Sequence, residues 1–207
     1  WTEEGSPLAV ITRQQAEAMQ QRLGANVTVD WAMRYGTPSI PERLQALMDA
    51  GCERILLAPL YPQYSGATTA TVVDKAADKL KAMRWQASLR TLPPYHDDAA
   101  YIDALASDLS RQLDALPFDP EVLLLSFHGM PQRTLELGDP YHCHCHKTAR
   151  LLEARMAREG LRFRTSFQSR FGRAKWLEPA TDAVLADVLA LDEQTLQQLG
   201  DAGVFGN

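Results

Sequence analysis

The chain has 207 residues, of which 45% are hydrophobic, and 26 acidic against 21 basic side chains give a formal net charge of -5. Such a chain can form one large domain or two small ones with a real core. Neither acidic nor basic residues form a long block, so the charge pattern does not indicate nucleic acid as a partner. No apolar run approaches the roughly 20 residues that cross a bilayer, so we expect no transmembrane segment and leave peripheral membrane contact open.

The cysteine count indicates the compartment. Cys52, Cys143 and Cys145 are an odd number, which suits free thiols in a reducing environment better than a disulfide framework. We therefore expect a cytoplasmic protein.

Both ends of the chain are expected to be truncated, because the chain opens on Trp1 in a loop and closes on the small polar tail DAGVFGN. A fragment of a longer protein is the expectation.

Helical and strand patterns alternate along the chain. They predict, in order, a helix after an N-cap at Thr12, a strand over 27–33, a helix from Pro41 to a stop at Gly51, a strand over 53–62 buried on both faces, a helix after 63–69, a strand over 86–92, a helix over 99–116, a strand at 122–125, a helix over 142–159, a strand over 161–167 and a helix over 181–191. This alternation predicts an α/β fold with mostly parallel sheets. The change of period at 116–120 predicts domains 1–118 and 119–207.

His128 follows the apolar run at 122–125, where the strand ends and Gly129 and Pro131 turn the chain. The carboxyl ends of parallel strands are where α/β proteins bind ligands. A lone histidine is more often structural. At this position, however, a neutral imidazole could accept a proton near pH 7 or bind a borderline metal ion such as Fe²⁺.

The run His142, Cys143, His144, Cys145, His146 offers five consecutive metal-binding side chains. Structural zinc sites space their cysteines differently, so a polar helix start that is rich in soft ligands is the simpler interpretation. On a helix, His142 and His146 would share one face while the cysteines point away. Both interpretations stay open.

Polar and aromatic side chains follow the other predicted strands. Arg34 and Tyr35 could meet a carboxylate or lie in solvent. Tyr61 and Tyr64 could form a wall for a flat apolar ligand, while nearby hydroxyls could serve only as helix caps. The same sheet edge would receive Gln168, Ser169, Arg170 and Trp176.

Six motifs together resemble the ferrochelatase family over residues 1–190, in order and spacing. They are GSPL from Gly5, MRYGTPSI from Met33, PLYPQYSGATT from Pro59, SFHGMP from Ser126, GDPY from Gly138 and FQSRFGRAKWLEPATD from Phe167. The resemblance implies two Rossmann-like half-domains that hold a porphyrin between them. It implies insertion of Fe²⁺ into protoporphyrin IX or coproporphyrin III during haem synthesis.

By the same resemblance, His128 matches the family's essential histidine, assigned to iron or to the pyrrole protons. The motifs that line the porphyrin pocket contain Ser6, Arg34, Tyr35, Tyr64, Ser65 and Trp176. No cofactor is expected beyond the substrate Fe²⁺, and an iron–sulfur cluster is not expected. We expect a monomer or a weak homodimer.

The chain also departs from the family. Members begin with a strand and a glycine-rich loop, and they end with a segment that carries a glutamate opposite the histidine. We expect both parts to be missing here, and Glu193 is a weak match to that glutamate. The alternatives are therefore an inactive fragment, a non-catalytic porphyrin- or haem-binding module, and a chelatase for cobalt or nickel.

Overall fold

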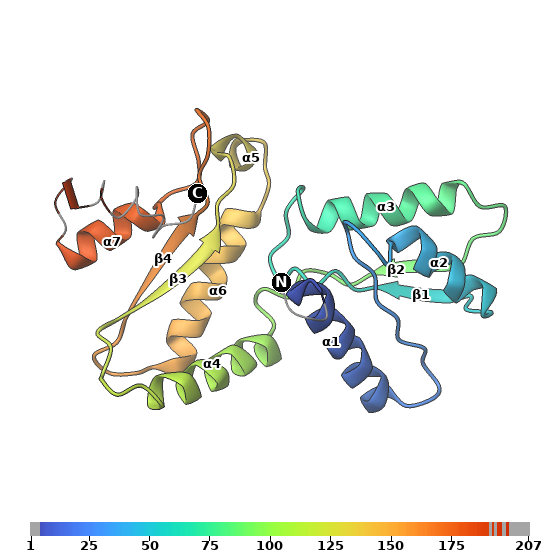
Figure 1. The fold of residues 1–207 in the computed structure, drawn as a ribbon, viewed down its shortest axis with the longest axis horizontal. Helices are drawn as coiled ribbons and strands as arrows, with labels where there is room; N and C mark the ends of the chain where they lie inside the picture. Colours follow the sequence, from blue (N-terminus) through green and yellow to red (C-terminus); the bar gives the residue numbers. More distant parts are fainter. Residues whose placement is uncertain (1–4, 191, 193, 196–197, 199–207) are drawn as a thin grey trace. The chain divides into compact units, whose positions relative to one another are not determined.

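The computed structural model describes residues 5–190, 192, 194, 195 and 198, and it confirms an α/β protein with parallel strands. The elements are α1 (Pro7–Leu23), α2 (Ile40–Asp49), β1 (Arg54–Leu57), α3 (Thr69–Lys81), β2 (Ser88–Thr91), α4 (Ala99–Asp114), β3 (Val122–His128), α5 (Gln132–Glu136), α6 (Tyr141–Met156), β4 (Arg162–Gln168) and α7 (Thr181–Leu189) (Figure 1). Glu193 and the predicted helix end at Leu191 lie outside the described residues.

The chain divides into two compact units. The first contains the described residues up to Leu60 together with 66–93, and the second contains 61–65 and the described residues from Pro94 onward. Helix α4 therefore belongs to the second unit. A division of the family's half-domains after residue 118 stays a prediction.

In the first unit, β1 and β2 form a parallel pair with Ile55 opposite Leu89. Buried side chains of α2 and α3 pack against Ile55, Leu57 and Leu89. Successive side chains of a strand point to opposite faces, so Leu56 points away from this core and is 61% exposed. The prediction that this strand is buried on both faces was therefore wrong: the described helices cover only one of them.

The strand predicted over 27–33 is also absent from the described structure. The side chain of Gln20 occupies the backbone groups that a neighbouring strand would need: its Nε2 donates to the Val27 carbonyl at 2.9 Å and its Oε1 accepts from the Val29 N–H at 2.8 Å. Arg43 of α2 donates two hydrogen bonds of 2.7 Å to Asp30. Side chains thus fix this segment, and Met33 keeps only an isolated bridge to Ser39.

Helix α1 begins at Pro7, earlier than the predicted start after Thr12. Proline suits the first turn because its missing N–H would have no helical partner there. Ser6 is the N-cap residue, and its carbonyl accepts from the Val10 N–H at 3.1 Å. The Thr12 hydroxyl donates to the Leu8 carbonyl inside the helix, so it is not a cap.

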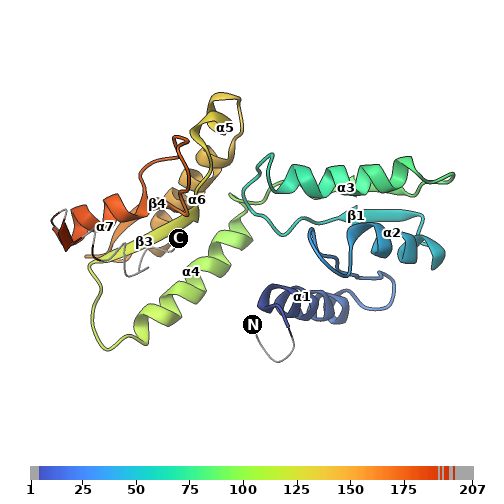
Figure 2. The same cartoon turned by 45° about the horizontal axis from the view of Figure 1, so that its top comes forward.

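In the second unit, β3 and β4 pair in parallel from Val122 and Arg162 to His128 and Gln168. Phe127 and Phe167 point to the face covered by Cys145 of α6. Ser126 and Ser166 point to the other face, where both contact the hydroxyl of Thr181 at the start of α7. Helices therefore lie on both faces of this strand pair (Figure 2).

Helix α4 packs along α6, and the ion pair of Asp103 with Arg155 joins them. The short helix α5 was not predicted from the sequence. Among the described residues, no helix is both long and apolar enough to span a membrane.

Candidate functional site

His128 is the last residue of β3, and its side chain is exposed. The predicted strand stopped before Ser126, but the ladder to β4 extends it through His128. The His128 carbonyl accepts a hydrogen bond of 3.0 Å from the Tyr141 hydroxyl. Burial raises the pKa of Tyr141, so this phenol remains a proton donor to the carbonyl. The backbone of His128 is therefore fixed while its imidazole remains accessible.

Gly129 brings the end of β3 against the segment that follows β4. Its N–H donates to the Gln168 carbonyl at 2.7 Å. A Cβ on Gly129 would lie 2.5 Å from that oxygen and 3.3 Å from Cε3 of Trp176. Glycine is needed here because a side chain would collide with the backbone.

Trp176 lies beside this turn and is largely buried. Its indole N–H donates to the Phe171 carbonyl at 3.0 Å, and its ring centroid lies 4.8 Å from that of Phe171. Backbone bonds from Gln132 to Lys175 and from Leu177 to Met130 hold the segment in place. Trp176 is thus a fixed aromatic wall next to the strand that carries His128.

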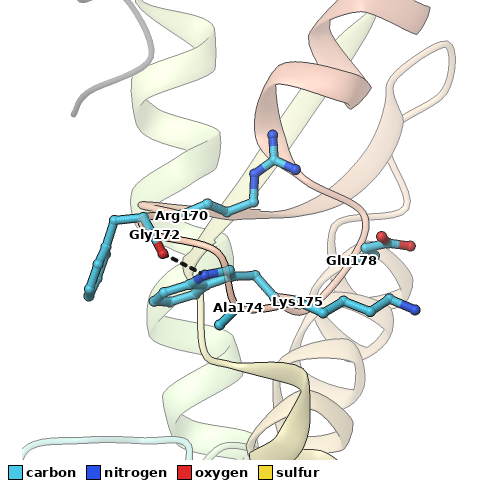
Figure 3. A pocket seen from close by; sticks show the side chains of 7 residues that line it. Arg170, Gly172, Ala174, Lys175 and Glu178 are labelled. Carbon is cyan, nitrogen blue, oxygen red and sulfur yellow. Dashed lines mark hydrogen bonds between the residues drawn. The ribbon is translucent and has the colours of Figure 1, made fainter.

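An open pocket of about 440 Å³ lies along this wall. Its lining combines aromatic and charged side chains with small residues: Arg170, Phe171, Gly172, Ala174, Lys175, Trp176 and Glu178. Phe171 is 72% exposed, and Arg170 forms an ion pair with Asp182. Lys175 and Glu178 extend to the same side in Figure 3. Sequence reasoning did not single out Phe171 and Lys175, although both fall within the motif that contains Trp176.

The segment 61–65 joins the second unit through its polar groups. The Tyr64 N–H donates to Nδ1 of His144 at 3.1 Å, and the Ser65 hydroxyl donates to Asp139 at 3.0 Å. Ser65 is fully buried. A role of Tyr64 and Ser65 in binding substrate stays a prediction, and these bonds give Ser65 a structural role as well.

The first unit holds Ser6, Arg34 and Tyr35. The Arg34 guanidinium lies 4.5 Å from the centroid of the Tyr35 ring, which is 74% exposed. Nε of Arg34 is buried and has no hydrogen-bond partner among the described residues. Ser6 makes no side-chain cap bond to α1. Arg34 therefore has one buried donor that is unsatisfied within the described residues.

The histidines of α6 are divided between two faces. His142 and His146 lie one turn apart with their Nε2 atoms at 3.2 Å, and His142 stacks on Phe167. His144 points the other way and stacks on His96 at 3.6 Å. Cys143 is exposed and Cys145 is buried. In the described part of the chain, no three His, Cys, Asp or Glu side chains gather as metal ligands.

Burial favours the neutral form of several of these rings. It lowers the pKa of His96 and of His144, whose rings also repel each other when protonated. Asp97 lies 3.8 Å from His96, but burial outweighs its attraction. Burial, His142 and Arg150 lower the pKa of His146. Sequence reasoning missed His96, because its partner is 48 positions away at His144.

Together, these features define an α/β protein with an accessible imidazole at a strand end, beside a rigid aromatic and cationic pocket. Such a histidine can accept a proton or coordinate a borderline metal, and the wall suits a flat ligand.

The chain belongs to the ferrochelatase family, because the family model described as Ferrochelatase matches residues 2–197. It is similar to curated proteins named Ferrochelatase, with 56% identity to that of Rhizobium meliloti (strain 1021) over 86% of this chain and 53% of the relative. For the protein of Azoarcus sp. (strain BH72), the identity is 52% over 93% of this chain and 53% of the relative. The chain thus spans about half the length of the curated relatives it matches.

Proposed function

We propose that the protein inserts Fe²⁺ into a porphyrin, protoporphyrin IX or coproporphyrin III, as a step of haem synthesis. Membership of the ferrochelatase family is the observation that carries this proposal. The accessible side chain of His128 next to the wall formed by Trp176 supports it. The protein would act in the cytoplasm, which its three free thiols favour.

In this proposal, His128 is the catalytic residue. Metal insertion removes two protons from the pyrrole nitrogens, so the site needs a base or an iron ligand that presents the metal to the ring. An exposed imidazole on a rigid strand can do either. The proposal requires no cofactor besides the substrate iron and includes no iron–sulfur cluster.

The remaining candidates would bind the macrocycle. Trp176 and the exposed Phe171 line the pocket with aromatic surface, and the guanidinium of Arg34 would pair with a carboxylate of the porphyrin. We assign Ser6, Tyr35, Tyr64 and Ser65 to the same binding role, on the motifs they share with the family. The protein would work as a monomer or a weak homodimer, without nucleic acid, and peripheral contact with a membrane would suit its apolar substrate.

The test supplies Fe²⁺ and protoporphyrin IX to the purified chain without oxygen and follows haem by absorbance. We expect His128→Ala to reduce the rate at least about 100-fold, the scale of a lost acid–base group. The matched control is Arg162→Ala, which changes an exposed residue at the opposite end of the strand pair. Equal loss in both variants would contradict a role of His128.

The same assay separates the alternatives. Tight porphyrin binding, measured by fluorescence quenching, without haem formation would identify a binding module and overturn the catalytic proposal. Faster insertion of Co²⁺ or Ni²⁺ than of Fe²⁺ would overturn iron as the substrate.

A further inference from the structure

The Nε2 atoms of His142 and His146 have the separation expected of two ligands of one metal ion. Their Nε2 atoms are 3.2 Å apart. Two nitrogens bound tetrahedrally to zinc at about 2.0–2.1 Å lie about 3.3 Å apart. A metal could therefore enter between the two rings with only a small adjustment of either side chain.

A backbone oxygen lies at a matching distance. The carbonyl of Glu178 is 3.4 Å from Nε2 of His142, again close to the edge of a tetrahedron around such an ion. Oxygen and imidazole nitrogen together suit Fe²⁺, Co²⁺, Ni²⁺ and Zn²⁺. Water would complete the coordination, because both histidines are only partly buried.

The rings are also held in place before any metal binds. His142 stacks on Phe167 with centroids 5.3 Å apart, and His146 packs on the same ring at 5.9 Å. Phe167 is fully buried in the middle of the second unit's core. A packed support of this kind lowers the entropic cost of bringing two ligands to one point.

We propose that His142, His146 and the carbonyl of Glu178 form a second divalent-cation site, separate from His128, for a borderline ion such as Zn²⁺ or Fe²⁺. When the metal binds, the ring that donates through Nε2 changes tautomer, so that its proton lies on Nδ1 and both rings bind the ion as neutral imidazoles. Arg150 acts electrostatically on His146 and opposes a cation there, which limits the affinity.

The site would connect α6 to the segment that bears Trp176. Glu178 lines the pocket along that wall and follows Trp176 by two residues. An ion shared by α6 and residue 178 would fix this segment more firmly. The proposal does not depend on iron insertion, because it concerns binding of the metal alone.

The experiment measures Zn²⁺ binding to the purified chain by equilibrium dialysis at pH 7.5. All proteins carry His128→Ala, which removes the candidate iron ligand. We expect one Zn²⁺ per chain, and we expect His142→Ala and His146→Ala each to weaken binding about tenfold or more. Cys143→Ser changes the exposed thiol between the two ligands and should bind Zn²⁺ like the parent.

Unchanged binding in both histidine variants would overturn the site, as would loss of binding in Cys143→Ser. His142→Gln and His146→Gln, checked by circular dichroism, guard against variants that fail to fold. Thermal unfolding gives a second measurement, because an ion bound only to the folded state raises Tm. Zn²⁺ should raise the Tm of the parent and of Cys143→Ser but not that of the histidine variants. An equal rise in all of them would also overturn the proposal.

Discussion

Replacing Gly129 with alanine should destabilise the second unit through one close backbone contact. The new Cβ would lie 2.5 Å from the Gln168 carbonyl oxygen, so the two backbones must separate by roughly 0.9 Å to reach an ordinary contact of 3.4 Å. Crowding of this kind costs about 1–3 kcal/mol. The same separation breaks the bond of 2.7 Å from the Gly129 N–H, at about 0.5–1.5 kcal/mol. Together, we expect these two effects to lower the free energy of unfolding by about 1.5–4.5 kcal/mol.

Urea unfolding, followed by tryptophan fluorescence, measures this loss as a lower midpoint. With a slope of about 1–3 kcal/mol per molar urea, the midpoint should fall by at least roughly 0.5 M. Arg133→Ala, in the exposed part of α5, is the control and should change stability by less than about 0.5 kcal/mol. A Gly129→Ala protein within that same margin would refute the steric reasoning. Haem formation should also fall in Gly129→Ala, because the shift moves the residue next to His128.

Two further predictions rest on burial. Folding lowers the pKa of His96, His144 and His146 below the ordinary value of 6.5. The unfolded chain therefore binds more protons than the folded chain, and the free energy of unfolding should fall as the pH drops from 7.5 through 6.5. Urea midpoints at pH 7.5 and 5.5 measure this, and an equal or higher midpoint at pH 5.5 would contradict it. Burial raises the pKa of Cys145 to about 12, so a thiol reagent at pH 8 should modify the exposed Cys143 rapidly and Cys145 only on unfolding. Equal reaction rates of the two thiols in the folded chain would contradict this assignment.

The elements that could be predicted from the sequence are those with strong local patterns. The sequence predicts α3 from apolar residues at helical spacing, and it predicts α2 from the Gly51 that follows it. Both predicted helices lie within a few residues of the observed ones. The strand predicted over 27–33 failed because Gln20, on a preceding helix, supplies its backbone partners. Nothing within the segment itself carries that information. β-branched composition indicates a strand only where another strand is available to pair with it.

In the candidate site, too, features with a local sequence pattern could be predicted, whereas contacts between distant residues could not. The position of His128 at a strand end followed from an apolar run and the turn residues after it, and the structure places it there. The contact of Gly129 with Gln168 and Trp176 joins residues about 40–50 positions apart, so it depends on the register of β3 and β4. The pairing of His96 with His144 depends likewise on how α4 and α6 pack. Such long-range contacts decide which side chains meet, and the sequence pattern alone does not reveal them.

Helix α6 shows why a run of ligand residues need not be one site. Residues two positions apart on a helix point in different directions, whereas residues four apart share a face. His142 and His146 therefore meet over Phe167, while His144 meets His96 and the backbone of Tyr64. Within α6, the proposed metal site therefore involves only the first pair, because Nδ1 of His144 already accepts a hydrogen bond and its ring stacks on the buried His96. Substitution of His144 should consequently disturb the segment 61–65 and leave Zn²⁺ binding at the other face intact.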